Sequence, residues 1–281
     1  MTRRLRWRAL TAGEYETSLA RLESWPAPAG GAVRHMFALS ALEANGPRVG
    51  RVASDDDGWA LAVVFPGRLV VPCGDPHALR RAGEPTRRWR LLVGDAAASD
   101  AVLGHVGPDP TLQVHHQRYM RVAPDRVPDA SEVADPGLRR AVREDVEGLA
   151  ELAVRLHVDD LFGPDPGRAG LRGYGRRLAE GVEKGLVWVV GPVGAPVVKV
   201  ERSVSSRRFG VQLAGIVVAP EARGEGLGRA AVAAAVRQAL AEPPARRPVT
   251  LHVRAANDAA LRAYAGAGFV DVEEWRLAVR G

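Results

Sequence analysis

The hydrophobic pattern of the chain alternates between strand-like and helix-like segments, and it is clearest over residues 211–241. Ile216, Val217 and Val218 belong to a short apolar run that is rich in β-branched residues and has the length of a strand. Pro220 cannot donate a hydrogen bond to a neighbouring strand, so the strand is predicted to end before it.

A helical pattern follows this strand after a turn. Val232, Val236 and Leu240 recur every four residues, and alanines fill most of the positions between them. This spacing places the three side chains on one face of a helix that runs to residue 241. The pattern therefore predicts a strand, a tight turn and a helix.

The turn between these two elements carries the alternating glycines Gly224, Gly226 and Gly228. Glycine lets the backbone curl and lets a ligand approach the main chain closely. The N–H groups of the first helical turn, such as those of Leu227 and Arg229, have no partner inside the helix, and the helix dipole favours negative charge there. The turn is therefore predicted to bind a phosphate or pyrophosphate.

Arg223, directly before the glycines, adds a positive charge that can chelate phosphate oxygens. The dinucleotide fingerprint G-x-G-x-x-G is not met, because its third glycine position holds Arg229, and no G-K-[ST] triplet of a P-loop follows. The pattern that remains is R-x-x-G-x-G, from Arg223 to Gly228. On this turn alone, an ordinary strand-to-helix connection is an equally good interpretation.

The rest of the chain is predicted to form two mixed halves of the α/β (α+β) class. In the first half, strands are predicted at residues 2–8, 48–53, 59–65, 68–72, 89–93 and 112–122, and helices at 12–25, 33–44, 76–82 and 95–106. In the second half, further strands are predicted at 138–142, 186–190, 196–203, 249–253 and 269–279, and helices at 144–157, 174–184 and 257–267. Residues 123–137 are rich in Pro and Asp and read as a linker, which predicts domains at 1–130 and 131–281.

Composition narrows the function classes. The chain has 281 residues, of which 46% are hydrophobic, enough for a sizeable core. Cys73 is the only cysteine, so no internal disulfide forms; it is predicted to be a buried small hydrophobe, and no metal site is predicted. No apolar run reaches the ~18 to 20 residues of a membrane span, and the basic N-terminus lacks the apolar region of a signal peptide. We expect a cytoplasmic protein without a membrane partner.

The positive charge is concentrated in the second half. The net charge is +6, and residues 136–281 carry 22 Lys and Arg against 17 Asp and Glu, or +5. This excess suits an anionic ligand. The chain contains no block of five or six basic residues and no basic stripe interleaved with aromatics, which disfavours nucleic acid as a partner.

A second signature follows the predicted strand at 249–253. It reads Asn257-x-x-Ala260-x-x-x-Tyr264-x-x-x-Gly268-Phe269. Together with R-x-x-G-x-G and the order of the elements, it resembles the GNAT superfamily of acyl-CoA N-acyltransferases over residues 138–281. The resemblance implies a mixed, splayed central sheet flanked by helices. The first half resembles the degenerate, smaller GNAT-like module that precedes the catalytic domain in a bacterial group, without either signature.

The resemblance also implies acetyl-CoA as co-substrate. Family members hold its pyrophosphate with the N–H groups of the glycine-rich turn, here residues 223–229. They pair its pantetheine arm with the main chain of the central strand, here Ile216, Val217 and Val218, because this strand and the next splay apart. An N–H near Val218 would then stabilise the oxyanion of the tetrahedral intermediate.

Catalytic candidates follow from the same resemblance. Tyr264 matches the general acid that protonates the leaving thiolate, although a tyrosine at this position of an amphipathic helix is also typical of a packing residue. Asn257 is a candidate helix N-cap, a cofactor contact, or both. Glu201 is a candidate general base, or an exposed strand carboxylate. With Asp159 and Asp160 it is also a candidate site for a cationic amine, the two aspartates otherwise lying in a solvated loop.

Two functions remain open. The first is an N-acetyltransferase that moves acetyl directly to an amine, which is either a small molecule or the N-terminus or side chain of a protein. The second is a CoA-binding or protein-interaction module that keeps the fold without catalysis. The acceptor's identity and the choice between monomer and homodimer lie beyond the sequence.

Overall fold

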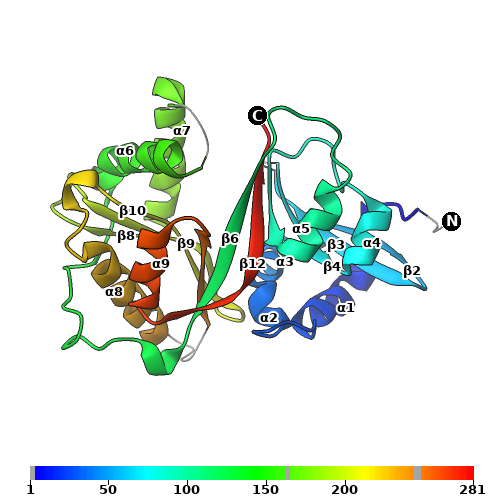
Figure 1. Ribbon diagram of the computed structural model, residues 1–281, viewed down its shortest axis with the longest axis horizontal. Coiled ribbons are helices and arrows are strands. Elements are labelled where there is room, and N and C mark those ends of the chain that lie inside the picture. The colour runs from blue at the N-terminus through cyan, green and yellow to red at the C-terminus, as the bar shows by residue number, and fades with distance from the viewer. Residues whose placement is uncertain (1–3, 67, 162–164, 243–247) are drawn as a thin grey trace. The chain divides into compact units, whose positions relative to one another are not determined.

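The computed structural model describes residues 4–66, 68–161, 165–242 and 248–281. It divides into two compact units, and Figure 1 labels many of their helices and strands. The first unit holds Met1–Tyr119, Arg254–Ala256 and Val272–Gly281, and the second holds Met120–Val253 and Asn257–Asp271.

The first unit is a mixed sheet with helices packed on it. The strands β1 to β5 lie in sequence order, followed by β12. Neighbours pair antiparallel except β4 and β5, which are parallel. The strands are β1 (Arg8–Ala9), β2 (Gly50–Asp55), β3 (Gly58–Val64), β4 (Leu69–Gly74), β5 (Leu91–Asp95) and β6 (Gln113–Val122). The helices are α1 (Ala12–Glu23), α2 (Gly31–Arg34), α3 (Met36–Asn45), η1 (Gly46–Val49), α4 (Pro76–Ala82) and α5 (Ala96–Leu103).

The strand predicted at residues 2–8 is wrong in its extent. Residues 1–3 lie outside the described part of the chain, and β1 covers only Arg8–Ala9. The N–H of Leu5 donates to the carbonyl of Arg81 in α4, so this segment bonds to a helix instead of a strand. Leu5 is buried in the core of the unit, which explains the apolar pattern that suggested a strand.

One face of this sheet packs against α4 and α5. Leu79 of α4 and Val102 of α5 are fully buried in one cluster with Leu92 of β5 and Trp89. Cys73 of β4 has no exposed surface, and burial raises the pKa of its thiol. The prediction of a buried, unreactive cysteine is confirmed.

The second unit contains the strand, turn and helix on which the sequence analysis centred. Strands β11, β10, β9, β8 and β7 are adjacent in that order, with β10 and β11 parallel and the other pairs antiparallel. The strands are β7 (Arg139–Arg140), β8 (Val187–Val190), β9 (Val198–Ser206), β10 (Gly210–Val218), β11 (Val249–Arg254) and β12 (Phe269–Val279), the last of which continues into the first unit. The helices are η2 (Pro124–Arg126), η3 (Arg143–Asp145), α6 (Val146–Leu156), η4 (His157–Leu161, a π-helical turn), α7 (Gly167–Glu183), η5 (Pro220–Ala222), α8 (Leu227–Ala241) and α9 (Asp258–Ala265).

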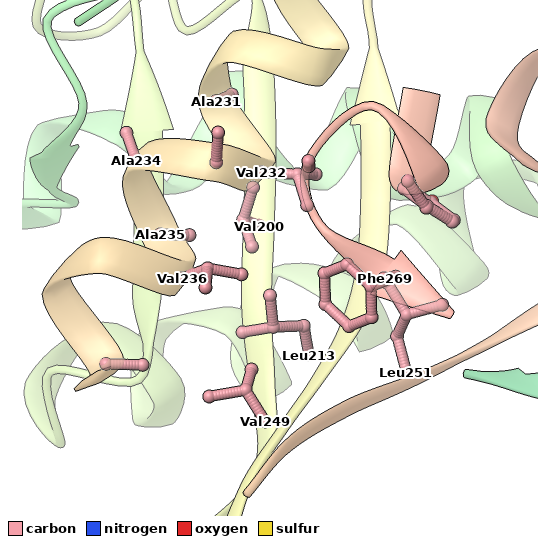
Figure 2. Close-up of a cluster of buried hydrophobic side chains, with 14 of the residues drawn as sticks. Val200, Leu213, Ala231, Val232, Ala234, Ala235, Val236, Val249, Leu251 and Phe269 are labelled. Carbon is pink, nitrogen blue, oxygen red and sulfur yellow. The ribbon is translucent and has the colours of Figure 1, made fainter. Parts of the chain in front are cut away.

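The core of the second unit lies between α8 and the sheet. Figure 2 shows Val232 and Val236 of α8 beside Val200 of β9 and Leu213 of β10, with Phe269 next to them. All five side chains are at least 97% buried, and burial of each such side chain stabilises the fold by roughly 1.5–3 kcal/mol. The other face of β10 packs on α6. The predicted apolar face of α8 is therefore confirmed, and β10 is held from both sides.

The start of α7 differs from prediction. The pattern predicts a helix from residue 174, but α7 begins at Gly167 and includes Gly170 and Gly173. Glycine lowers helix propensity by about 1 kcal/mol, which is why the sequence argued against a helix there. Packing of α7 against α6 overrides that preference, with Leu178 and Leu149 buried in a shared cluster.

The two compact units also divide the chain differently from the predicted boundary near residue 130. Residues 120–130 lie in the second unit, and residues 272–281 lie in the first. The reason is the pairing of β12 with β5, in which Trp275 faces Asp95 and Val279 faces Leu91. An alternating hydrophobic pattern predicts that a strand forms, but it does not predict which other strand pairs with it.

Within the described part of the chain, the structure contains no helix of the length and apolarity required to cross a bilayer.

Candidate acyl-CoA site

The central strand β10 is paired on one side only at its C-terminal end. Towards β11 the pairing covers Val211, Gln212 and Leu213. Towards β9 it continues to Val218 at the end of the strand. Among the described residues, the last stretch of β10 thus has no strand partner on the β11 side. An unpaired edge of this kind can accept an extended ligand as a pseudo-strand.

A β-bulge interrupts β10 in the same stretch. Ala214 faces Glu201 and Val217 faces Lys199, so Gly215 and Ile216 together oppose one residue of β9. Gly215 has φ +54°, a left-handed conformation that glycine adopts at low cost. Bulges re-aim backbone groups and are enriched beside active sites. The bulge turns the main chain of Ile216, a residue predicted to contact pantetheine.

The turn after β10 has the geometry of an anion cradle. Gly224 (φ +91°) and Gly226 (φ +76°) are both left-handed, and a Cβ added to either would meet no atom within 4 Å. The first helical hydrogen bond of α8 is donated by the N–H of Ala230 to the carbonyl of Gly226, at 3.0 Å. The N–H groups of Leu227, Gly228 and Arg229 therefore precede the helical ladder, and N–H groups at this position of a helix can bind a ligand. The predicted turn of glycines before a helix is confirmed; its ligand stays a prediction.

Two side chains flank this turn closely. Gly228 faces Val218 across the turn, where an added Cβ would lie 3.2 Å from Cγ2 of Val218. The stem of Arg229 packs over Gly266, at the C-terminal end of α9. These contacts fix the first turn of α8 against β10 and α9, so its N–H groups have a defined direction.

Arg223 is engaged by two groups of the protein. Its Nε donates to the carbonyl of Val218 at 3.0 Å, and its Nη2 lies 3.1 Å from Oδ2 of Asp159. Both side chains of this ion pair are about half exposed, so it contributes at most about 1 kcal/mol. A phosphate carrying more charge can replace Asp159 at the guanidinium.

The second signature folds as α9 between β11 and β12. Asn257 is its N-cap, and its side-chain oxygen accepts a hydrogen bond from the N–H of Ala260 at 3.1 Å, so the predicted cap is confirmed. Tyr264 lies on the buried face of α9 with 7% of its surface exposed, and its ring is 6.3 Å from that of Phe269. Tyr264 thus packs in the core of the unit and also keeps a small exposed surface.

Glu201 lies in a strongly cationic environment. Its Oε2 accepts from Nη1 of Arg177 at 2.6 Å, and its Oε1 pairs with Nζ of Lys199. Burial raises the pKa of Glu201, but Lys199 and Arg177 lower it further, to about 2. A general base works best with a pKa near the working pH, so the structure does not support the predicted base role.

Of the predicted acidic site for a cationic amine, the structure describes two of the three side chains. Asp159 pairs with Arg223, Glu201 pairs with two cations, and the side chain of Asp160 lies outside the described residues. The two described carboxylates belong to separate ion pairs. The charge of these two carboxylates is balanced by cations of the protein.

Three residues at this site were not predicted from the sequence: Gly215, Lys199 and Arg177. A glycine within an apolar strand is a signal of a bulge. Lys199 and Glu201 are two residues apart on β9, and this period places them on the same face of the strand. Arg177 left no such signal, because it comes from α7, far away in sequence.

Known proteins resemble the part of the chain that forms this candidate site. Residues 183–269 match the family model for the acetyltransferase (GNAT) family. The match lies almost entirely in the second unit and covers less than half of the chain. The matched segment contains β9, β10, the glycine-rich turn, α8 and α9. No curated protein matches the chain.

Several solved structures resemble nearly the whole chain. A GNAT-family acetyltransferase from Colwellia psychrerythraea has 10% identity and a TM-score of 0.57, with 98% of this chain and 99% of that chain covered. A GCN5-related N-acetyltransferase from Sphaerobacter thermophilus has 15% identity and a TM-score of 0.57, with 100% and 96% covered. A tandem GNAT protein from the clavulanic acid biosynthesis pathway has 16% identity and a TM-score of 0.57, with 98% of both chains covered. At these identities the likeness shows the fold, which is that of a two-part GNAT protein.

The ion pairs of Glu201 predict a specific acid dependence of stability. The carboxylate has a pKa of about 2 in the folded protein and an ordinary value near 4.5 in the unfolded chain. Its ion pairs therefore stabilise the fold above about pH 4.5, and this contribution is lost as the pH falls towards 2. We expect Glu201→Gln to lower the free energy of unfolding at pH 7, and the difference from wild type to shrink between pH 4.5 and 2.

Urea unfolding at a series of pH values measures this difference. Glu221→Gln, which removes an exposed carboxylate in η5, is the matched control and should leave the free energy of unfolding nearly unchanged. A wild-type minus Glu201→Gln difference that stays constant down to pH 2 would contradict the assignment.

Proposed function

We propose that the second unit transfers an acetyl group from acetyl-CoA to an amine. The observation that carries the proposal is the junction of β10 and α8. In the described part of the chain, a strand edge without a strand partner, with a bulge, leads directly into an open glycine turn and the first-turn N–H groups of a 15-residue helix. This junction offers one surface for an extended arm and, beside it, one for a pyrophosphate.

The proposed placement follows the residues of the junction. The pyrophosphate lies on the N–H groups of Leu227, Gly228 and Arg229, with Arg223 moving from Asp159 to the phosphate. The pantetheine arm lies along Ile216, Val217 and Val218. The thioester then reaches the bulge, where a main-chain N–H can donate to its carbonyl oxygen.

The proposed reaction is a direct transfer. The amine nitrogen attacks the thioester carbonyl carbon, and a tetrahedral intermediate forms with its negative charge on oxygen. The carbon–sulfur bond then breaks, and Tyr264 donates its phenolic proton to the leaving thiolate. The proton lost by the amine passes to solvent, Tyr264 regains a proton from solvent, and the products are the N-acetylated amine and CoA.

We propose no CoA site in the first unit. Its helices after β4 and β5 begin with aspartate caps. Asp75 accepts from the N–H of His77 at 2.9 Å, and Asp95 accepts from the N–H of Ala98 at 3.0 Å. A carboxylate at these positions takes the helix N–H groups that a phosphate would need. The caps support the prediction of a non-catalytic module.

Acetyl-CoA turnover tests the proposal. CoA release is followed with a thiol reagent against a panel of amines and amino acids, and CoA affinity is measured by calorimetry. Turnover with at least one amine supports acyl transfer. CoA binding without turnover across the panel supports the alternative of a non-catalytic CoA-binding module. Absence of CoA binding overturns both.

A further inference from the structure

Three charged side chains meet beside the bulge of β10. Arg177 of α7 contacts both carboxylate oxygens of Glu201, with Nη1–Oε2 at 2.6 Å and Nη2–Oε1 at 3.2 Å. Lys199 pairs with the same Oε1. A Cβ on Gly215 would lie 2.5 Å from Oε1 of Glu201 and 2.8 Å from Nζ of Lys199. The cluster Arg177–Glu201–Lys199 therefore touches the backbone where the thioester is proposed to lie.

The three side chains differ in their access to solvent. The exposed fraction of the side chain is 1% for Lys199, 13% for Glu201 and 54% for Arg177. The ammonium of Lys199 is thus a fixed part of the interior, whereas the guanidinium of Arg177 forms the outer end of the cluster. A ligand arriving from solvent meets Arg177 first and Glu201 behind it.

The charge of the cluster restricts what can bind. Two cations and one anion give it a formal charge of +1. A purely cationic amine on Glu201 would raise the charge to +2 and leave Arg177 without its partner, which is unfavourable beside a buried ammonium. An amine that also carries a carboxylate adds no net charge, and each of its groups finds a partner.

We propose that, if the second unit is the acyltransferase described above, its acceptor is a small α-amino acid. The α-ammonium replaces Arg177 at Glu201, and the α-carboxylate binds the released guanidinium. The two charged groups of an α-amino acid are separated by about one ion-pair distance, which matches the exchange of a single Arg–Glu contact. Arg pairs with carboxylates in a bidentate manner, which adds geometric specificity.

Arg177 is held in place by its neighbours on the same side. Its guanidinium lies over the ring of Tyr174, 5.9 Å from the centroid, and the Tyr174 hydroxyl is 3.1 Å from Nδ1 of His157. These contacts limit how far the guanidinium moves when the acceptor arrives. Tyr174 is thereby a positioning residue for the carboxylate site.

The same exchange explains product release. Glu201 holds the acceptor as an ammonium; the ammonium loses one proton to solvent, and the neutral amine attacks the thioester carbonyl. The nitrogen–carbon bond forms and the nitrogen loses its second proton to solvent. The carbon–sulfur bond breaks, the thiolate receives a proton from Tyr264, and Tyr264 regains a proton from solvent. The amide product has no positive charge, so it no longer matches Glu201. Arg177 then returns to Glu201 and displaces the product.

The test compares each amino acid with its own primary amide, which keeps the amine and loses the carboxylate charge. The full chain is assayed with acetyl-CoA and the twenty amino acids, their amides and simple alkylamines. We expect kcat/KM to favour the best amino acid over its amide by about 10- to 100-fold, the value of one charged hydrogen-bonded pair. Arg177→Gln should raise the KM for the amino acid about tenfold or more and remove this preference, with the KM for acetyl-CoA unchanged.

Arg176→Gln is the matched control, because Arg176 is the adjacent exposed arginine on α7; it should keep the wild-type preference. An amide or alkylamine that is used as well as the amino acid would overturn the proposal and leave the acyltransferase function intact. So would a preference that survives Arg177→Gln. No turnover of any amino acid by a protein that still binds CoA would also refute the proposed acceptor, without affecting the CoA site.

Discussion

Replacing Gly226 with aspartate is expected to reduce CoA affinity by at least about 100-fold. Gly226 is the N-cap of α8, with φ +76° and no atom within 4 Å of an added Cβ. Asp is among the residues that tolerate this left-handed conformation, at a cost of about 1–2 kcal/mol, so the helix should still form. The new carboxylate would face the N–H groups of Gly228 and Arg229 and repel the pyrophosphate.

Gly226→Asn is the control that distinguishes the effect of the carboxylate charge from the effect of adding a side chain at this position. Asn has nearly the same size and the same tolerance of the left-handed conformation, but no charge. We expect it to weaken CoA binding far less than Asp does, as measured by calorimetry at fixed ionic strength. Equal losses for Asp and Asn would show that steric or backbone change is responsible. Unchanged affinity for Gly226→Asp would refute the pyrophosphate assignment.

Replacing Tyr264 with phenylalanine is expected to lower kcat about 100-fold or more, the usual contribution of a positioned general acid. The change removes one hydroxyl and keeps the ring that packs beside Phe269, so the fold and the KM for acetyl-CoA should change little. The measurement is steady-state turnover with the best acceptor, accompanied by the midpoint of thermal unfolding.

The two measurements together separate chemistry from packing. A low kcat with an unchanged unfolding midpoint supports the acid role. If kcat stays at the wild-type value, Tyr264 is a packing residue and the thiolate is protonated by another group. A parallel loss of stability and activity would point to the core and remove the evidence for proton transfer.

The local parts of the site were predictable from sequence. Pro220, the glycines of the turn and the four-residue spacing of α8 each act through short-range rules, and the structure places the elements where those rules predict. The same holds for Asn257, whose cap depends on a residue three positions away. Motifs of this kind depend on residues that are close together in the chain, so a single sequence is enough to predict them.

Features that depend on a distant partner were not predictable. The bulge at Gly215 exists only relative to the register of β9, and the ion pair of Glu201 needs Arg177 from a helix 24 residues earlier. The pairing of β12 with β5 joins residues almost 200 positions apart. Such contacts arise from tertiary packing, which a hydrophobic pattern does not encode.

These long-range contacts changed the chemical interpretation more than the local ones. Taken alone, Glu201 is a candidate base. Lys199 and Arg177 lower its pKa to about 2, so at neutral pH it is an anion. For this reason the acceptor that we propose is a zwitterion and not a simple cation. The donor half of the site depends on local motifs, and the acceptor half depends on the assembled sheet and helices.

A crystal structure of the protein with bound CoA tests the assignment of the β10–α8 junction most directly. We expect the pyrophosphate oxygens within hydrogen-bonding distance, about 3 Å, of the N–H groups of Leu227, Gly228 and Arg229. The pantetheine arm should pair with the main chain of β10 beyond Leu213. CoA bound elsewhere, such as in the first unit or away from the glycine turn, would contradict the assignment.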